Sequence, residues 1–467
     1  MILANGRLYE TSAQSELLSG LENKLIHTLS GPPLEADTVI AALDTLGRQV
    51  ERGLFDNLIA SLQIDGAEQY KQLAVRMLRR DYLEFKLRTE LGADFCRDTK
   101  TQPPAGFPPL RKLTRPLGVL LHIAAGNADG LPAFSVAEGL VTGNINLLKL
   151  PQADNGLTME IFRALLENEP RLGDYLYVFD TPSSDVAAIK RLADLSDGIV
   201  VWGGETAVTA VRRFAQPGTR LIEWGHRLSF AYFSGAASDE DLSALAAHLV
   251  TTKQLLCSSC QVIYLDAEEM TDVSAFCDRF FPILERSAQA YRPRTLGAAA
   301  ELTLRTYTDK LERVLDGGAS QKWKSPLCSL LPKQDMELEL SPMFANVLVK
   351  RLPRKEIMPV LRRGKQYLQT VGLSCAEADR DTLIEAFSRA GLTRITRPGE
   401  MSAALPGEAH DGVYPLRQYL RTVDIEESFF FRRENVSVQY PVISRRFIAE
   451  KSVLSTQKGT DFSLRSK

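Results

Sequence analysis

The stretch LGVLLHIAAGNADGLPAFSVAEGLVTGNINLLKL, residues 117–150, decides the fold class. Two apolar runs, at 117–124 and 145–150, flank a run of helical character at 132–141. Apolar runs of this length suit strands that are buried on both faces of a sheet. A helix between two such strands is the usual connection between parallel neighbours. The stretch therefore predicts a strand–helix–strand unit of a parallel sheet.

The same alternation continues toward the C-terminal side. Strand-like and amphipathic helix-like runs take turns up to residue 224, and a second alternating region follows from residue 228. The strand-like runs are YLYVF, GIVVWG, TRLIEW, LSFAYF and QVIYL, with later ones at MFANVLVKRL and GLTRITR. Short apolar strands alternating with amphipathic helices are typical of a parallel α/β sheet that is covered on both faces. We therefore predict an α/β protein.

Composition places the chain among ordinary globular proteins. It has 467 residues, of which 44% are hydrophobic and 24% charged, which is enough for two or three domains. The 56 Lys and Arg residues nearly cancel the 58 Asp and Glu residues, and the net charge of −2 offers no field for nucleic acid or anionic membrane. Residues 1–20 lack the pattern of a secretory signal, and no apolar run is long enough to span a membrane. We expect no transmembrane segment and no nucleic-acid partner.

Six scattered cysteines do not form a disulfide framework in a chain of this length. They are Cys96, Cys257, Cys260, Cys277, Cys328 and Cys375. We expect free thiols in a reduced, cytoplasmic protein.

Changes in the pattern of apolar and polar residues divide the chain into four segments. Residues 1–105 alternate apolar and charged residues at helical spacing and predict a mostly helical N-terminal region. Two α/β regions follow, at 106–228 and 229–425, and residues 426–467 read as an extended arm and a polar tail. We see no internal repeat and no low-complexity segment.

No standard nucleotide-binding loop accompanies the predicted sheet. Neither GxGxxG nor GxxxxGK[ST] occurs in the sequence. Gly203 and Gly204 end a strand-like run and Glu205 opens a helix, an arrangement that leaves free N–H donors for a phosphate. Because a glycine pair at such a junction is more often simple turn chemistry, the pattern alone leaves both explanations open.

The stretch KQLLCSSCQVIYLD, residues 253–266, places two of the six cysteines between a helix-like end and a strand-like run. A redox or metal-binding pair, two buried thiols, or one nucleophile with a neighbouring thiol would each produce this pattern. No thioredoxin-like pattern surrounds the pair, and His226 and His248 lie at no recognisable metal-ligand spacing, so we expect no metal.

Three segments, in this order, resemble the aldehyde dehydrogenase superfamily: GNINLLKLP (143–151), LIEWGHRLSF (221–230) and KQLLCSSCQ (253–261). In that superfamily a strand ending in Lys holds the cofactor ribose, a Glu-x-Gly-Gly-Lys-like stretch follows, and the nucleophilic cysteine comes next. The interval of 34 positions from Glu223 to Cys257 fits the superfamily's spacing. The resemblance implies a Rossmann-type dinucleotide-binding domain at 106–228 and a catalytic domain at 229–425.

Further blocks resemble one branch of that superfamily, the LuxC-type fatty acyl-CoA reductases. The blocks are HIAAGN, QLLCSSCQ, ELELSPMFANVLV, YLQTVGL, RITRPGEM and PGEAHDG, and the resemblance covers roughly residues 110–425. Two positions depart from the pattern. Cys260 stands where branch members have Pro, and the Gly-Gly-Lys segment reads Gly225-His226-Arg227.

The resemblance implies three catalytic residues. Cys257 would form a covalent acyl thioester, for which a thiolate is suited as both nucleophile and leaving group. Asn127 would stabilise the oxyanion together with the backbone N–H of Cys257. Glu223 matches the general base of hydrolytic aldehyde dehydrogenases, and in a reductase it would instead orient substrate, assist thiolate formation or permit a thioesterase side activity. Cys260 is then a packed neighbour.

The resemblance also implies the cofactor contacts. Lys149 would hold the adenosine ribose, and Gly203 and Gly204 would lie near the pyrophosphate. NAD-preferring relatives carry a carboxylate three positions after this lysine, whereas this chain has Gln152. The absence of that negative charge favours a 2′-phosphate, so NADPH is the expected cofactor.

The implied reaction is the NADPH-dependent reduction of long-chain fatty acyl-CoA, or of partner-delivered acyl groups, to fatty aldehyde. The family resemblance implies an acyl-protein synthetase and an acyl transferase as partners, as in bacterial luminescence, and a homo-oligomer. Two alternatives stay open: an oxidising, hydrolytic aldehyde dehydrogenase, and a non-catalytic scaffold that binds acyl groups or partner enzymes.

Overall fold

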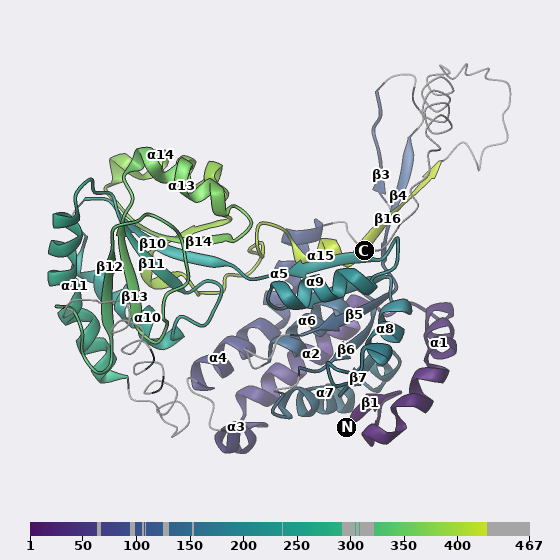
Figure 1. Ribbon diagram of the computed structural model, residues 1–467. Helices are drawn as coiled ribbons and strands as arrows, with labels where there is room; N and C mark the ends of the chain where they lie inside the picture. Colours follow the sequence, from purple (N-terminus) through teal and green to yellow (C-terminus); the bar gives the residue numbers. More distant parts are fainter. Residues whose placement is uncertain are drawn as a thin grey trace, which may run out of the picture. The chain divides into compact units, whose positions relative to one another are not determined.

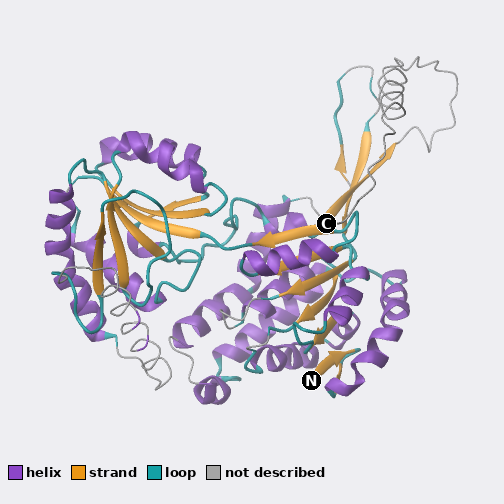
Figure 2. Cartoon of the chain, in the orientation of Figure 1, coloured by secondary structure: helices purple, strands orange, loops and turns teal. Residues whose placement is uncertain are grey.

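The computed structural model describes residues 1–62, 67–93, 99–104, 107, 109–124, 130–151, 154–235, 237–291, 304, 308 and 322–426. Figures 1 and 2 show these residues as helices packed around parallel sheets. The predicted α/β fold with parallel sheets is confirmed. None of the described helices is both long enough and apolar enough to cross a membrane.

A seven-stranded sheet forms the first core, in the order β2-β1-β7-β6-β5-β8-β9. Its strands are β1 (Ile2–Ala4), β2 (Arg7–Tyr9), β5 (Val119–Ile123), β6 (Ile145–Lys149), β7 (Leu176–Phe179), β8 (Gly198–Trp202) and β9 (Arg220–Trp224). The five strands from β7 to β9 are parallel, whereas β1 is antiparallel to β7 and to β2. The predicted unit of residues 117–150 supplies β5 and β6, which lie side by side.

Both faces of this sheet are covered by helices because side chains alternate along each strand. In β5, Leu120 packs with α2, α6 and α7, whereas Val119 and Leu121 pack with α1, α8 and α9. The helices of this part are α1 (Gln14–Ser30), α2 (Ala36–Glu51), α3 (Asp56–Leu62), α4 (Ala67–Leu78), α5 (Arg80–Leu91), α6 (Leu131–Val141), α7 (Leu157–Asn168), α8 (Val186–Asp194) and α9 (Glu205–Phe214).

The described part of the N-terminal region supplies α1 to α5 and also the short strands β1, β2 and β3 (Thr99–Lys100), which the sequence did not predict. β1 and β2 add to the edge of the seven-stranded sheet. A strand of two or three residues is too short for an alternating pattern to distinguish it from a helix end or a turn.

A six-stranded, fully parallel sheet forms the second core, in the order β12-β13-β11-β10-β14-β15. Helices α10 and α11 cover one face, and α13 and α14 cover the other. The elements of this part are β10 (Leu228–Phe233), α10 (Asp239–Thr252), β11 (Cys260–Leu265), α11 (Met270–Ala290), β12 (Ser329–Lys333), β13 (Asn346–Arg351), α13 (Ile357–Leu361), β14 (Leu368–Ser374), α14 (Glu377–Ala390) and β15 (Arg394–Thr396).

The remaining elements are short. The strands β3 (Thr99–Lys100), β4 (Leu110–Pro116) and β16 (Leu420–Glu426) form a three-stranded sheet in the order β16-β4-β3. The other short elements are η1 (Thr11–Ala13), η2 (Pro170–Asp174), η3 (Arg354–Glu356), η4 (Arg362–Gly364), η5 (Pro398–Glu400) and α15 (Pro415–Gln418).

The described chain forms two compact units. One comprises the described residues of 1–97 and 114–422, and therefore both large sheets, and the other comprises those of 98–113 and 423–426. The four-segment division drawn from the sequence stays a prediction.

Candidate active site

The order of strands in the first sheet marks a crevice for a ligand. From β5 the chain moves outward through β6 and β7, then returns to place β8 on the other side of β5. In open parallel sheets, ligands bind beyond the carboxyl ends of the two strands where the direction of winding reverses. Gly203 and Gly204 follow β8 at that position, and Gly204 is the N-cap of α9. A Cβ at Gly204 would meet no atom within 4 Å, so the backbone there is open to a ligand.

Cys257 lies in the turn between α10 and β11 of the second sheet. Helix α10 ends at Thr252, and the next two residues, Lys253 and Gln254, have φ values of 50° and 61°. These left-handed conformations reverse the chain abruptly. A hydrogen bond to the neighbouring strand β10 fixes the turn: the Ser229 hydroxyl donates to the Cys257 carbonyl at 2.8 Å. Cys257 itself is exposed.

A polar chain of three further residues supports the thiol of Cys257. The amide Nε2 of Gln369 donates to Cys257 Sγ at 3.3 Å and to Asp411 Oδ1 at 2.7 Å. Asp411 Oδ2 accepts a hydrogen bond from Arg227 Nε at 2.8 Å. The Gln369 and Asp411 side chains are almost completely buried, so their orientations are set by these partners.

An irregularity in the strands aims Gln369 at the thiol. In the pairing of β10 with β14, Leu228 is opposite Leu368 and Phe230 is opposite Val371, so one residue of β10 faces two of β14. Such a bulge redirects side chains and is common beside active sites. Gln369 is one of the two residues in this bulge, and Ser229, which holds the Cys257 carbonyl, faces it.

Opposing effects act on the ionisation of Cys257. Burial of the sulfur raises the pKa of the thiol, the hydrogen bond from Gln369 lowers it, and the Asp411 carboxylate raises it. The net result is a thiol pKa above the ordinary value. The cost of removing a thiolate from water is therefore larger than the stabilisation that the Gln369 hydrogen bond provides. This amide is therefore well placed to control how much thiolate exists near neutral pH.

Two cavities meet at Cys257. The larger, of about 460 Å³, is also lined by Trp202, Gly203, Gly204 and Trp224, from the end of the first sheet. The smaller, of about 150 Å³, is polar and is lined by residues that include Gln369, Thr393, Arg394, Ser402 and Glu408. A thiol with space on two sides can meet one reactant from each.

An aromatic group forms one wall of the larger cavity. The ring of His410 lies 5.2 Å from that of Trp202 and 4.7 Å from that of Trp224. Burial is the main cause that lowers the pKa of His410, so the imidazole is neutral at neutral pH. His410 lines both cavities that Cys257 lines.

Lys149 lies at the carboxyl end of β6 and is buried. Its Nζ donates to the Ser183 hydroxyl at 3.1 Å. Burial lowers the pKa of this lysine, and the Asp180 carboxylate partly offsets that effect. Lys149 is not among the residues that line the cavities at Cys257.

Glu223, on β9, is held away from these cavities. Arg212 of α9 donates to both of its carboxylate oxygens, at 2.6 and 2.5 Å. Glu223 lines neither of the cavities at Cys257. Arg212 therefore occupies both carboxylate oxygens of Glu223 in this arrangement.

The structure thus brings three of the seven predicted site residues to one cavity, Cys257, Gly203 and Gly204. Glu223 and Lys149 lie elsewhere, and Asn127 and Gln152 lie outside the described residues. The roles predicted for all seven stay predictions.

Cys260, the second cysteine of the pair, is completely buried at the start of β11. Its thiol donates to the Val262 carbonyl at 3.3 Å, and burial raises its pKa to about 12. Such a thiol is inert as a nucleophile. Across the described ranges, no group of three or more His, Cys, Asp or Glu side chains is placed to hold a metal ion.

Solved structures with this fold are aldehyde dehydrogenases. A methylmalonate-semialdehyde dehydrogenase from Oceanimonas doudoroffii has a TM-score of 0.70, with 12% identity, and the match covers 94% of this chain and 99% of that chain. A second protein of that description, from Sinorhizobium meliloti and solved in complex with NAD, has a TM-score of 0.66, with 15% identity and 90% coverage of each chain. The chain therefore has the aldehyde dehydrogenase fold.

Within that fold class, the chain belongs to the acyl-CoA reductase (LuxC) family, whose model matches residues 41–422. A long-chain acyl-protein thioester reductase of Photobacterium phosphoreum is 22% identical over 357 residues, which cover 73% of this chain and 68% of that protein. The predicted family membership is confirmed, and the protein is an oxidoreductase of the acyl reductase type.

Sequence reasoning did not identify Gln369, Asp411 or His410 as site residues. All three lie inside blocks that resemble the family, YLQTVGL and PGEAHDG, but they were not assigned a role. The available signal was the presence of polar residues at the end of an apolar strand run and in a Gly-rich loop. Their proximity to Cys257 depends on the pairing of β14 with β10, which one sequence does not specify.

We predict that replacing Gln369 by Leu raises the pKa of the Cys257 thiol. Removal of one hydrogen bond to a charged group costs about 1.5–3 kcal/mol, or roughly one to two pKa units. Below that pKa the thiolate fraction falls, so alkylation of Cys257 by iodoacetamide at neutral pH slows by about tenfold or more. Rates in the variant and the wild type converge at high pH, where both thiols are ionised.

Peptide mass spectrometry of Cys257 across a pH series measures this effect. Gln366→Leu is the matched control, because the Gln366 side chain is exposed and only its carbonyl is used, by Arg227. An alkylation profile that is the same in Gln369→Leu as in the wild type would contradict the assignment.

Proposed function

We propose that this protein reduces long-chain fatty acyl-CoA, or acyl groups delivered by a partner protein, to fatty aldehyde through a thioester on Cys257, with NADPH as the reductant. The observation that supports this most strongly is the thiol of Cys257, which accepts a hydrogen bond from a buried amide and belongs to a residue that lines two cavities. Membership of the acyl-CoA reductase family supports the substrate class.

In the proposed reaction the Cys257 thiolate attacks the acyl carbonyl and releases the donor thiol. Gln369 stabilises the thiolate before attack, and Asp411 with Arg227 keeps the amide in position. The neutral imidazole of His410, which lines both cavities, is the proposed acceptor of the thiol proton. Asn127 is the proposed oxyanion donor, with the backbone N–H of Cys257.

The larger cavity at Cys257 fits a nicotinamide group. Two buried polar atoms of its lining residues, Trp224 Nε1 and Gln254 Oε1, have no hydrogen-bond partner among the described residues. One is a donor and the other an acceptor, which matches the carbonyl and the amino group of a carboxamide. We infer that a small rotation of Trp224 makes its Nε1 a ligand of the carboxamide oxygen. Gln254 can serve as the acceptor only if its Nε2 gives up its hydrogen bonds to the Cys260 carbonyl and the Ser341 hydroxyl. The cofactor, when bound, supplies the hydride that reduces the acyl thioester.

The rest of the cofactor is assigned to the end of the first sheet. Gly203, Gly204 and the free N–H groups of the first turn of α9 suit the pyrophosphate. Lys149, with Gln152 three positions further on, suits a ribose 2′-phosphate. Burial lowers the pKa of this lysine, and the nearby Asp180 carboxylate partly offsets that effect.

The bidentate pair of Glu223 with Arg212 bears on the main alternative, a hydrolytic aldehyde dehydrogenase. Hydrolysis of the acyl-cysteine needs a free base to activate water. Because Arg212 occupies both oxygens of Glu223, we propose that this carboxylate does not activate water against the thioester, which then remains available to hydride. We propose that Glu223 acts in this chain as a positioning residue for α9 and β9. An acyl-protein synthetase, an acyl transferase and a second copy of the chain remain the proposed partners.

Cys257→Ala is predicted to abolish covalent labelling by radioactive tetradecanoyl-CoA and to reduce aldehyde formation by at least about a thousandfold. The matched control is Cys260→Ala, because Cys260 is buried and its thiol bonds to a carbonyl. This control should keep labelling at the wild-type level. Full labelling of Cys257→Ala, located by peptide mapping, would overturn the assignment of the nucleophile.

Lys149→Met is predicted to weaken NADPH binding by about ten- to a hundredfold, since a charge-assisted hydrogen bond to phosphate contributes about 1.5–3 kcal/mol. NADH binding should change far less, because NADH lacks the 2′-phosphate. Quenching of tryptophan fluorescence measures both affinities, and Lys190→Met, an exposed lysine that pairs with Asp194 on α8, is the control. Equal losses for both cofactors would argue against a 2′-phosphate contact.

A further inference from the structure

A third cavity, which is almost entirely apolar, lies among the helices on one face of the seven-stranded sheet. Its volume is about 260 Å³, and α2, α3, α4, α6 and α7 contribute to its wall. The apolar lining includes Val50, Ile59, Ala74, Phe134, Ala137 and Leu165. None of the residues that carry the chemistry at Cys257 takes part in it.

The cavity is much larger than an ordinary packing defect. Protein interiors contain few voids larger than a water molecule, and a space of about 150 Å³ lined by Leu, Ile and Phe stays dry and takes up apolar molecules. Small side chains keep this space open, among them Ala74 on α4 and Ala137 on α6. A void of this kind suits an apolar guest.

The cavity shares one lining residue with the catalytic region. Leu131, the first residue of α6, lines both this cavity and the larger cavity at Cys257. The two cavities are therefore neighbours, with the Leu131 side chain in the wall of each.

The described residues around the cavity present no free cation to an anionic group. Among the described lining residues Lys71 is the only charged one, and its Nζ is paired with the Asp56 carboxylate at 2.5 Å. Because that ammonium is already neutralised, only the alkyl stem of Lys71 faces an occupant. Tyr70, which also lines the cavity, is 48% exposed, so the space opens to solvent at this residue.

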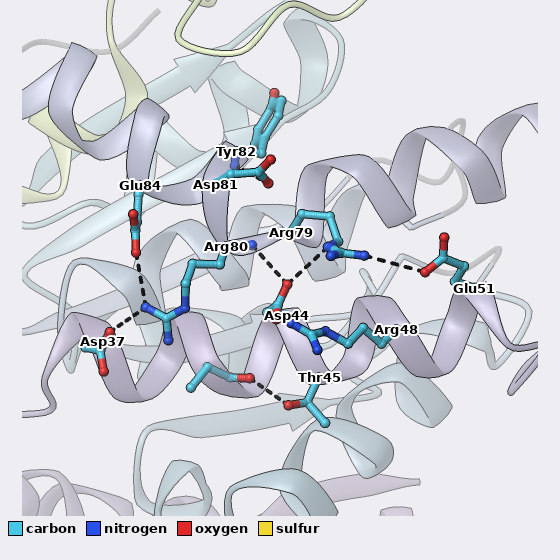
Figure 3. Close-up of polar contacts among 11 residues, drawn as sticks. Asp37, Asp44, Thr45, Arg48, Glu51, Arg79, Arg80, Asp81, Tyr82 and Glu84 are labelled. Carbon is cyan, nitrogen blue, oxygen red and sulfur yellow. Dashed lines mark hydrogen bonds and ion pairs between the residues drawn. The ribbon is translucent and has the colours of Figure 1, made fainter.

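A set of ion pairs joins two of the helices that form the wall (Figure 3). Asp44 of α2 accepts hydrogen bonds from Arg48 at 2.6 Å and from the backbone N–H of Arg80 at 3.1 Å, and it pairs with Arg79 at 3.2 Å. Arg79 and Arg80 mark the junction of α4 with α5. Burial raises the pKa of Asp44, but these hydrogen bonds and charges lower it by more, so the carboxylate is ionised and holds the start of α5, directly after α4, on α2.

We propose that this cavity binds the alkyl chain of the acyl substrate, with the thioester end at Cys257 and the chain passing Leu131. The proposal rests on the proposed function and adds to it the site that determines which acyl chain lengths are bound. Because Lys71 is already paired, the site favours uncharged, long alkyl chains. Because the cavity opens at Tyr70, the site sets no fixed upper limit on chain length.

Ala74→Phe tests the proposal, because a phenyl ring at this position fills part of the cavity. Each methylene excluded from an apolar site costs roughly fourfold in affinity. We expect the acylation of Cys257 by tetradecanoyl-CoA, followed by intact mass spectrometry, to slow by about tenfold or more. Acylation by butanoyl-CoA should change by less than about twofold, because a short chain ends before the cavity.

A binding measurement separates this proposal from the proposed function. The fluorescent fatty acid analogue dansyl-aminoundecanoic acid is titrated into Cys257→Ala and into the double variant Cys257→Ala, Ala74→Phe. Its fluorescence reports binding alone, since the signal requires neither acylation of the protein nor reduction. The proposal predicts saturable binding to the first protein and about tenfold weaker binding to the second. If aldehyde formation is absent but this difference is found, the proposed function fails and the cavity assignment stands.

Two further variants complete the test. Ala41→Phe places the same ring on the exposed side of α2, outside the cavity, and should leave acylation and probe binding unchanged. Ala137→Leu fills the cavity from α6. It replaces Ala74→Phe in the test if the thermal unfolding midpoint of Ala74→Phe shows that this variant does not fold. Unchanged tetradecanoyl-CoA acylation and unchanged probe binding in a folded cavity variant would overturn the proposal, and so would the absence of probe binding to Cys257→Ala.

Discussion

A thiol attacks a thioester as the thiolate, and burial in a protein opposes that ionisation. The geometry around Cys257 answers this constraint with hydrogen-bond donors, of which the side-chain amide of Gln369, held in line by Asp411 and Arg227, lowers the pKa of the thiol most. The three supporting residues come from β14, from the segment before α15, and from the turn between β9 and β10. The second sheet is therefore needed as a whole, because its strand order brings residues 227, 257, 369 and 411 together.

The first sheet provides the complementary part of the site. Its winding reverses between β5 and β8, and Gly204 after β8 leaves the backbone open at that point. Trp224 and Gln254, each with a buried polar atom that has no partner among the described residues, are lining residues of the larger cavity at Cys257, where we propose that the carboxamide binds. The helices on one face of the same sheet enclose the apolar cavity, which shares the lining residue Leu131 with this region. In this account one sheet and its helices hold both the reductant and the chain, and the other holds the nucleophile.

The sequence predicted the fold well, because buried parallel strands are visible as apolar runs separated by helix-length segments. It also predicted Cys257 and the glycine pair as site residues, since local motifs mark both. Gln369 was not predicted, because its contact with the thiol depends on a bulge in the pairing of β14 with β10, and register is a tertiary property. The ion pair of Glu223 with Arg212 was likewise not predicted, since it depends on how α9 packs beside β9. Strands β1 and β2 carry too few residues for a pattern to form.

The central claim is that hydride, and not water, resolves an acyl group bound to Cys257. The most direct measurement incubates the full chain with tetradecanoyl-CoA and NADPH that carries deuterium at its transferable position, and then identifies the product by mass spectrometry. The account predicts tetradecanal with one deuterium on its carbonyl carbon. Tetradecanoic acid as the product, or an aldehyde without the label, would contradict it.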